Sequence, residues 1–246
     1  MKRCRRKWDQ YTTLIDEEFL KAYLPETKPL DESSFWELLD RNKQIIVKPN
    51  RGRWGNGVLK IKKIEGNKYE FCSEMNKRCI HGRFDTYKNV KRYLISDENI
   101  VQHAISLAEI GGAPFDLRVM VQRKKNSPTW AITGMVAKVA SKRYFITNTA
   151  GKVMNVDKAL EDSNIKKMNY NELIKLIEEI SIVTAEKLSS VYPKHRIYGI
   201  DIGIDKKGKP WLFEANFNPN LAYFRMLADK KTLNKIRNFK RKKASK

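Results

Sequence analysis

The chain of 246 residues carries 50 Lys and Arg against 28 Asp and Glu, a formal net charge of +22 that predicts binding to something anionic. No zinc finger, RNA-recognition signature or aromatic–basic repeat accompanies this charge, so nucleotide phosphates or an acidic peptide are expected rather than a specific nucleic acid. Three cysteines without CxxC spacing argue against a disulfide framework, and no stretch is apolar enough for a membrane helix or signal peptide, so we expect a cytoplasmic protein without membrane association.

The first 43 residues read as a helical lead-in. The basic run 2–7 is typical of a solvated tail. Apolar residues then recur at helical spacing from Leu14 to Tyr23, and Leu24-Pro25 ends that run. A second helix is predicted from about Asp31. Nothing in this part indicates chemistry.

A glycine-rich loop follows. The strand Gln44–Val47 leads to Lys48-Pro49, then to Gly52, Gly55 and Gly57, and a new strand is predicted over Val58–Lys62. Closely spaced glycines let backbone N–H groups cradle phosphate oxygens, and Lys48 would place a cation beside them. The loop is not a Walker A motif, because no Lys-Ser/Thr follows the last glycine and the chain returns to a strand. The alternative is a glycine-containing hairpin with a surface lysine.

The middle of the chain is rich in predicted strands. The stretch 100–105 reads as a strand that runs into a connector, either a hinge against which a purine lies or plain core. Asp116 and Arg118 share one face of the next strand, which suits a terminal phosphate and its metal, although a structural ion pair is the alternative. A further long strand over Trp130–Ala140 carries Lys138, and Asn148 lies at another strand edge.

The remaining elements are scaffold. Asn169 to Glu172 has capping-box spacing before a long amphipathic helix. A single basic helix is predicted over Leu221–Asn238, where packing and solvation are the simplest explanation.

Between these helices lies the most informative segment, a hairpin of strands Tyr198–Asp205 and Pro210–Asn216 around Lys207-Gly208. Glu214 and Asn216 are two residues apart, so both point to one face, and Asp201 on the partner strand can face them. Two carboxylates and an amide oxygen on rigid strands suit Mg²⁺, which commonly shares its remaining positions with substrate phosphates. The alternative is a polar sheet face with a cross-strand pair.

Taken in order, the motifs VKPNRGRWGNGV, NIVQHAI, FDLRVMV, FITN and GIDIGID…WLFEAN resemble the ATP-grasp superfamily, most closely the YheC/YheD-like group associated with bacterial spore coats. The resemblance implies an α+β fold in which two lobes with antiparallel sheets grip the nucleotide. On this basis residues 44–105 form the small lobe, 106–220 the large lobe, and 221–246 a basic helix and tail. The separate N-terminal domain common in ATP-grasp ligases is not expected here.

The resemblance also implies roles for individual residues. Lys48 would contact the α and β phosphates of ATP, with the loop Gly52–Gly57 folded over them. The expected adenine hinge is Gln102, His103 and Ala104. Asp116 and Asn148 match nucleotide-binding positions of the family. Arg118 and Lys138 match the catalytic cations that face the transferred phosphoryl group. The matched Mg²⁺ ligands are Asp201, Glu214 and Asn216.

These matches imply an ATP- and Mg²⁺-dependent ligase that joins a carboxylate to an amine or thiol through an acyl phosphate. A kinase on the same scaffold, or a nucleotide-binding spore-coat protein without turnover, are the alternatives. Two departures affect the loops: Arg53 and Asn56 replace the lysine or serine often found in the glycine loop, and Asn148-Thr149-Ala150-Gly151 displaces one glycine of the usual pattern. The sequence does not name the acceptor or the oligomeric state, although the basic charge favours an anionic acceptor such as an acidic peptide.

Overall fold

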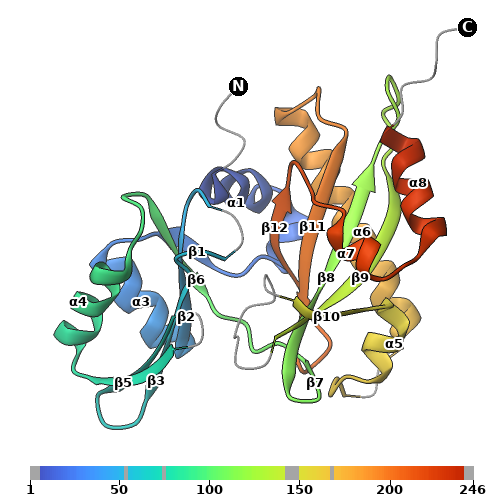
Figure 1. Cartoon of the computed structure of the whole chain (residues 1–246). Coiled ribbons are helices and arrows are strands. Elements are labelled where there is room, and N and C mark those ends of the chain that lie inside the picture. Colours follow the sequence, from blue (N-terminus) through green and yellow to red (C-terminus); the bar gives the residue numbers. More distant parts are fainter. Residues whose placement is uncertain (1–5, 53–54, 74–75, 142–149, 167–168, 241–246) are drawn as a thin grey trace, which may run out of the picture.

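The structure is a computed structural model that describes residues 6–52, 55–73, 76–141, 150–166 and 169–240. Within these residues the chain forms two lobes, each built on an antiparallel sheet, which stand side by side in Figure 1. Helices accompany both sheets, so the predicted α+β architecture of two lobes is confirmed.

The small lobe is a six-stranded sheet with two helices on one face. In sheet order its strands are β1 (Thr27–Pro29), β6 (Asn99–His103), β2 (Gln44–Pro49), β3 (Leu59–Ile64), β4 (Lys68–Ser73) and β5 (Asn76–His81). The helices α3 (Glu32–Asn42) and α4 (Arg83–Tyr93) pack on Ile45 and Val47 of β2 and on their neighbours. Because side chains alternate along a strand, Lys48 lies on the opposite face of the sheet from this core.

The large lobe holds the second sheet. Its strands are, in sheet order, β10 (Ala150–Met154), β9 (Ala131–Ala140), β8 (Ala113–Gln122), β11 (Ile197–Ile204) and β12 (Pro210–Asn216), with β7 (Glu109–Ile110) paired to β8. The long helix α6 (Tyr170–Val191) covers one face through Ile177 and Ile180, and α5 (Val156–Glu161) lies on the same side. The predicted cap of α6 is confirmed, since Asn169 Oδ1 accepts from the backbone N–H groups of Asn171 and Glu172.

The opposite face of the large-lobe sheet is partly covered by two short helices, not by the single helix predicted over Leu221–Asn238. α7 (Ala222–Met226) and α8 (Lys230–Lys240) pack on Met120 of β8 through Phe224 and Ile236. The break between them is a backbone feature: Ala228 has a φ of 57°, and the Asp229 carboxylate accepts from the N–H of Thr232 to start α8. Aspartate is a common N-cap residue, so Asp229 is the feature of the sequence that could have divided the predicted helix.

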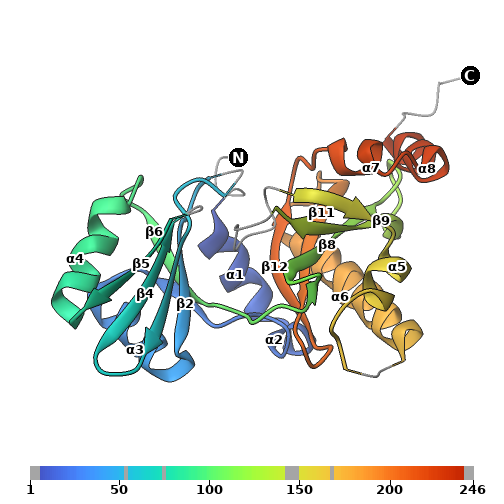
Figure 2. The same ribbon diagram turned by 60° about the horizontal axis from the view of Figure 1, so that its bottom comes forward.

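The first 43 residues are not a separate lead-in, and this expectation is corrected. β1 is an edge strand of the small-lobe sheet, whereas α1 (Lys7–Ile15) and α2 (Glu18–Lys21) place Leu14 and Leu20 in the core of the large lobe. Both Figure 1 and Figure 2 show α1 between the two lobes. The apolar spacing predicted helices correctly, but periodicity cannot tell which surface an apolar face will cover.

In the part of the chain that the structure describes, no helix is both long and apolar enough to cross a bilayer.

Candidate functional site

The central feature of the large lobe is a buried group of four charged side chains, called here the ionic cluster: Asp116, Arg118, Lys138 and Asp201. Arg118 of β8 lies opposite Asp201 of β11 in the strand register, and Asp116 lies opposite Lys138 of β9. Arg118 donates to both oxygens of Asp201, from Nε to Oδ1 at 2.7 Å and from Nη2 to Oδ2 at 2.9 Å. Lys138 Nζ lies 3.1 Å from Oδ1 of both Asp201 and Asp116.

The cluster pairs two carboxylates with two cations, so its net charge is zero. Each of the four residues is at most 7% exposed. Burial alone would raise the pKa of Asp201, but Arg118 and Lys138 outweigh burial and lower that pKa to about 2. Burial lowers the pKa of Lys138, and the Asp116 and Asp201 carboxylates more than offset it, so this pKa is raised. Asp201, Lys138 and Arg118 therefore stay ionised at neutral pH.

Two residues that the sequence analysis missed shape the space around Arg118. A Cβ on Gly199 would lie 2.5 Å from Cβ of Pro219 and 3.1 Å from Cδ of Arg118, so this position needs a glycine. Tyr223 on α7 places its ring centroid 5.8 Å from the Arg118 guanidinium and 5.5 Å from the Lys138 ammonium. Nothing in the sequence links Tyr223 to the strands, because only the packing of α7 brings it there.

The predicted hairpin is confirmed as β11 and β12, and it brings the three proposed metal ligands together. Glu214 lies directly opposite Asp201 in the register, and Asn216 Nδ2 donates to Asp201 Oδ2 at 2.9 Å. The register shifts between Asp201 and Ile202, which leaves Phe213 as an extra residue on β12. Its ring packs over Gly203, where a Cβ would lie 2.5 Å from it.

The chemistry of these side chains fits Mg²⁺ only in part. Both oxygens of Asp201 already accept two hydrogen bonds each, from Arg118, Lys138 and Asn216. Among the described residues, no group of three or more His, Cys, Asp or Glu side chains could hold a metal ion. Glu214 and the amide oxygen of Asn216 do fit a hard cation that takes its other ligands from phosphate and water. Asp201 as a metal ligand stays a prediction, because one of its oxygens would first have to give up a hydrogen bond to bind the ion.

The small lobe contributes Lys48. Its ammonium donates to Gln102 Oε1 at 2.8 Å, and Gln102 Nε2 donates in turn to Thr27 Oγ1 at 2.8 Å. The side chain keeps some exposure, yet burial around its ammonium lowers the pKa of Lys48 to about 8, against an opposing effect of Glu214. Glu214 belongs to the other lobe, and it lines the same pocket as Lys48. Unlike Lys138, Lys48 has a neutral amide as its hydrogen-bond partner.

The predicted adenine hinge is already hydrogen-bonded within the protein. The N–H of His103 donates to the Glu26 carbonyl at 2.8 Å, and the N–H of Ala104 donates to the Gln44 carbonyl at 3.2 Å. The Ala104 carbonyl accepts from the Gln44 side chain at 2.8 Å. A base read by these groups would have to replace such bonds, so the hinge role of Gln102, His103 and Ala104 stays a prediction.

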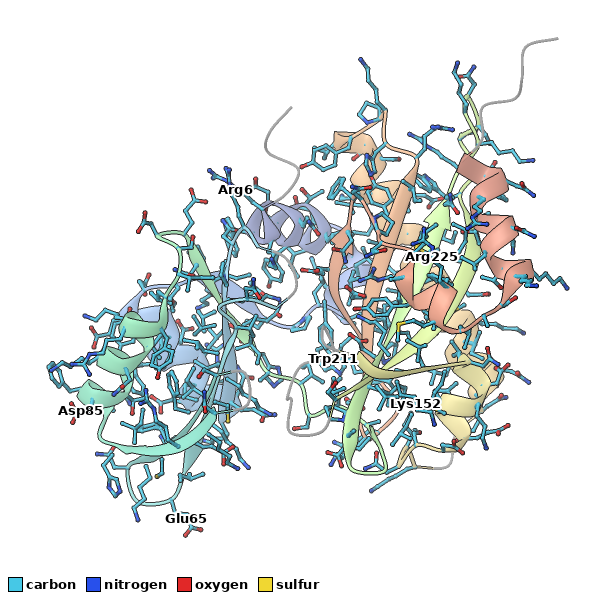
Figure 3. The ribbon with its side chains drawn as sticks, in the orientation of Figure 1. Arg6, Glu65, Asp85, Lys152, Trp211 and Arg225 are labelled. Atoms are coloured by element: carbon cyan, nitrogen blue, oxygen red, sulfur yellow. The ribbon has the colours of Figure 1, made fainter. Side chains whose placement is uncertain are left out.

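An aromatic contact joins the predicted hinge to the large lobe. The rings of His103 and Trp211 meet edge to face with centroids 6.1 Å apart, and Figure 3 shows Trp211 at the boundary between the lobes. The Trp211 indole donates to Asp205 Oδ2 at 3.0 Å, which fixes the ring at the end of the β11–β12 hairpin.

The glycine loop is described in part. Gly55 and Gly57 have φ values of 76° and 70°, a backbone conformation that favours glycine. A Cβ on Gly57 would also lie 2.5 Å from Cγ1 of Ile95. The Gly52 carbonyl oxygen accepts a hydrogen bond from the Lys7 ammonium at 3.4 Å. Arg53 and the proposed nucleotide-binding residue Asn148 lie outside the described residues.

A pocket between the lobes brings several of these groups together. Lys48 and Gln102 line it from the small lobe and Glu214 from the large lobe, and α1 adds Lys7 and Tyr11. The sequence analysis missed Lys7, because a lysine within a terminal basic run looks like part of a solvated tail.

The sequence profile described as YheC/D like ATP-grasp matches residues 2–243. The chain belongs to the YheC/D-like ATP-grasp family. The resemblance of its ordered motifs to this family is therefore confirmed.

A curated relative of this family is the endospore coat-associated protein YheD of Bacillus subtilis (strain 168). It is 24% identical over 238 residues, covering 89% of this chain and 49% of the relative. The chain thus spans about half the length of the curated relative that it matches.

Solved structures agree on the fold. The VanG D-Ala:D-Ser ligase of Enterococcus faecalis is similar with a TM-score of 0.58 at 13% identity, over 96% of this chain and 61% of that one. The ATP-grasp ligase PsnB complexed with a minimal precursor gives a TM-score of 0.54 at 11% identity, over 96% and 60%. At these identities the likeness shows the ATP-grasp fold alone.

Proposed function

We propose that the chain binds MgATP between its lobes and uses it to join a carboxylate to an amine or thiol, with release of ADP and phosphate. The observation that carries this proposal is the meeting of Lys48 and Glu214 in one pocket beside the ionic cluster, in a chain of an ATP-grasp family. Cations and hard oxygen ligands on facing lobes suit a polyphosphate and its metal.

The reaction would proceed in two steps. An acceptor carboxylate oxygen forms a bond to the γ-phosphorus of ATP, the bond to the β–γ bridging oxygen breaks, and ADP leaves. The amine or thiol then attacks the acyl carbon, phosphate leaves with the bonding electron pair, and the nucleophile loses its proton. The protein needs no side-chain nucleophile for this chemistry, because positioning and charge stabilisation suffice.

The proposed roles follow from the burial and the pairing of the side chains. Lys48 would donate to phosphate oxygens in place of Gln102. Arg118 and Lys138 would stabilise the transferred phosphoryl group, held in place by Asp116, Asp201 and the packing around Gly199. Such donors need little rearrangement when charge develops, since the sheet already fixes them.

Magnesium, when bound, would neutralise phosphate charge in this site. Glu214 and Asn216 would hold it, with Asp201 as the proposed third ligand. Such a cation would add positive charge that the ionic cluster does not supply, because Arg118 and Lys138 are already balanced by carboxylates.

A kinase would use the same residues for the first step, phosphoryl transfer, and would stop there. A nucleotide-binding protein without turnover, associated with spores as the name of YheD states for that relative, is the other alternative. Ligases among the structural relatives, including one complexed with a precursor, favour the ligase. The net charge of +22 favours an anionic acceptor such as an acidic peptide.

The test combines nucleotide turnover with a chemical trap. The protein is incubated with MgATP, hydroxylamine and a panel of single amino acids and glutamate-rich peptides. A ligase should release ADP and phosphate and yield a hydroxamate, whereas a kinase should give a stable phosphorylated product and no hydroxamate. A protein that binds MgATP and gives neither product would contradict the ligase proposal.

The matched variants are Glu214→Gln and Glu109→Gln. Glu109 lies in the same lobe and pairs with Lys206 at 3.0 Å, away from the pocket. Glu214→Gln should reduce turnover by roughly 100-fold or more, because charge stabilisation at the reacting phosphate is lost, whereas Glu109→Gln should keep it. Full turnover in Glu214→Gln would remove Glu214 from the site.

A further inference from the structure

One end of the large lobe is rich in basic residues and poor in acidic ones. It is formed by α8 and by the turn between β8 and β9, residues 123–130. Segments 117–141 and 215–246, which supply these elements, contain one acidic side chain, that of Asp229. This carboxylate accepts from the N–H of Thr232 at 3.0 Å and so caps α8. The many cations of these two segments are therefore not balanced by acidic residues of the same segments.

The helix and the turn form one continuous surface. Gln122 Nε2, at the end of β8, donates to the Ile236 carbonyl at 3.2 Å. Two residues further on, the Lys124 ammonium lies 5.7 Å from the centroid of the Phe239 ring on α8. Figure 1 accordingly shows the β8–β9 turn beside the C-terminal end of α8.

Four exposed lysines lie along this surface. Lys231, Lys235 and Phe239 follow one another at intervals of four residues, so they share one side of α8. Because the Phe239 ring meets Lys124, the line continues into the turn, where Lys125 is the next residue. We call Lys124, Lys125, Lys231 and Lys235 the basic row.

The stability of the fold does not account for the basic row. In the part of the chain that the structure describes, none of its four lysines forms an ion pair with a carboxylate. Lys231 lies in the first turn of α8, where the helix dipole disfavours a cation, and Lys235 repels it from one turn away. Residues that break such local rules commonly serve a function outside the fold.

The basic row is separate from the pocket between the lobes. Figure 1 and Figure 2 both show α8 on the side of the large lobe that faces away from the small lobe. The nucleotide and its metal therefore do not use these lysines, and a second anionic partner can reach them.

The surroundings of the row favour a polypeptide over a nucleic acid. Single strands bind largely by stacking on aromatic rings, and among the described residues of α7, α8 and the turn no aromatic ring is exposed. Met226, at the end of α7, is 57% exposed and offers an apolar contact instead. Carboxylates at alternate positions of an extended peptide lie about 6–7 Å apart, close to the spacing of about 5–6 Å between side chains one helical turn apart.

We propose that the basic row is a docking surface for an acidic polypeptide segment. Carboxylates of the segment pair with the four lysines, and an apolar residue of the segment contacts Met226. This docking needs neither nucleotide nor turnover, so it holds whether the protein is a ligase, a kinase or a non-catalytic protein. The competing explanation is that these lysines only add to the net charge and keep the protein soluble.

The test uses three fluorescein-labelled probes and fluorescence anisotropy at low salt. The first probe is a twelve-residue peptide of alternating Glu and Ala. The second replaces each Glu by Gln, and the third is a thymidine oligonucleotide with as many negative charges as the first. The row variant is Lys125→Gln/Lys231→Gln/Lys235→Gln. The matched control makes the same change in net charge at exposed lysines spread over both lobes: Lys62→Gln/Lys68→Gln/Lys175→Gln.

Wild-type protein should bind the Glu peptide more tightly than the oligonucleotide and should not bind the Gln peptide. The row variant should bind the Glu peptide about tenfold more weakly, because three exposed ion pairs are lost, and the control variant less than about twofold more weakly. An equal loss in both variants would overturn the proposal in favour of net charge alone. Tighter binding of the oligonucleotide would assign the surface to nucleic acid, and wild-type protein that does not bind the Glu peptide would remove the docking surface.

A second measurement needs no variant. Carbodiimide joins carboxylates to lysine amines that they contact, so treatment of wild-type protein with the Glu peptide should link the peptide to lysines of the basic row, identified by mass spectrometry. Crosslinks that are confined to other lysines would overturn the proposal even if the row variant failed to fold.

Discussion

The two sheets that face each other across the interlobe pocket hold their charges in different ways. The large-lobe sheet buries Arg118 and Lys138 together with Asp116 and Asp201, and each cation is within 3.1 Å of a carboxylate oxygen. The small-lobe sheet buries the ammonium of Lys48 against the side-chain amide of Gln102. The pKa of Lys138 is raised by its carboxylates, whereas that of Lys48 is lowered to about 8 by burial.

Under the proposed function, this difference would separate two tasks. An ionic cluster whose formal charges cancel gains little from an added anion, so it would serve as a fixed scaffold for the charge that develops during phosphoryl transfer. A desolvated lysine without a carboxylate partner gains at once from an anion, because the anion supplies the interaction that burial removed. We therefore expect nucleotide affinity to depend chiefly on the small lobe and fold stability chiefly on the cluster of the large lobe.

The largest expected effect tests the scaffold. Asp201→Asn should lower the free energy of unfolding by about 3–5 kcal/mol, because it leaves Arg118 and Lys138 buried with one carboxylate between them. The change is measured by urea unfolding at pH 7. Since the folded-state pKa of Asp201 is lowered to about 2, its stabilising effect is present above about pH 4 and is lost toward pH 2. The difference between the two proteins should therefore shrink over that range.

Asp40→Asn in the small lobe is the matched control. Asp40 also accepts from two cations, Lys63 at 2.7 Å and Arg83 at 2.9 Å, but its side chain is 39% exposed. Asp40→Asn should lower the free energy of unfolding by less than about 1 kcal/mol, because water screens such ion pairs. An equal loss of unfolding free energy in Asp201→Asn and Asp40→Asn would mean that burial does not distinguish the two sites.

The next effect tests the small lobe. Lys48→Met should weaken MgADP binding roughly tenfold or more, since a charged donor to phosphate is lost, and should remove most of the nucleotide-induced rise in melting temperature. The melting temperature without nucleotide should change little. Relief of the desolvated ammonium offsets the acceptor that is left unpaired at Gln102, which is 7% exposed.

Lys62→Met, on the adjacent strand β3, is the control for this experiment, because Lys62 is exposed and its removal takes away the same charge. It should leave nucleotide binding intact. Unchanged affinity in Lys48→Met, or an equal loss in both variants, would show that net charge rather than Lys48 attracts the nucleotide.

The contrast between the lobes also indicates what the sequence could predict. The two-residue period of a strand was enough to place Asp116 and Arg118 on one face. The hairpin itself followed from its turn, but Glu214 lies opposite Asp201 only because Phe213 is an extra residue on β12; regular pairing would have placed Phe213 there. The first inference rests on strand geometry alone, whereas the second needed a bulge that the sequence analysis did not predict. The strands around Lys48 were found from strand geometry as well.

Contacts between distant segments could not be predicted in this way. Arg118 meets Asp201 across 83 residues because β8 and β11 are neighbours in the sheet, an order that the chain alone does not reveal. Lys7 reaches Glu214 because α1 is bound to both lobes: Asn50 Oδ1 accepts from its first turn, and Gln10 Oε1 accepts from the N–H of Ala215. In each case the sequence identified the element but not its partner, and the partner decides the chemistry.

The smallest expected effect is proton uptake by Lys48, and it distinguishes the two lobes most directly. Lys48 is about half protonated at pH 8, and a bound polyphosphate should raise its pKa by supplying the anion that it lacks. Binding of ADP at pH 8 should therefore take up a fraction of a proton, up to about one half, seen as a binding enthalpy that varies with the ionisation enthalpy of the buffer. The uptake should fall at pH 7, where Lys48 is already mostly charged, and should be absent in Lys48→Met. The Arg118 and Lys138 pair should contribute nothing, since both are charged before the nucleotide arrives. Uptake that persists in Lys48→Met would place the titrating group elsewhere and would remove the distinction between the lobes.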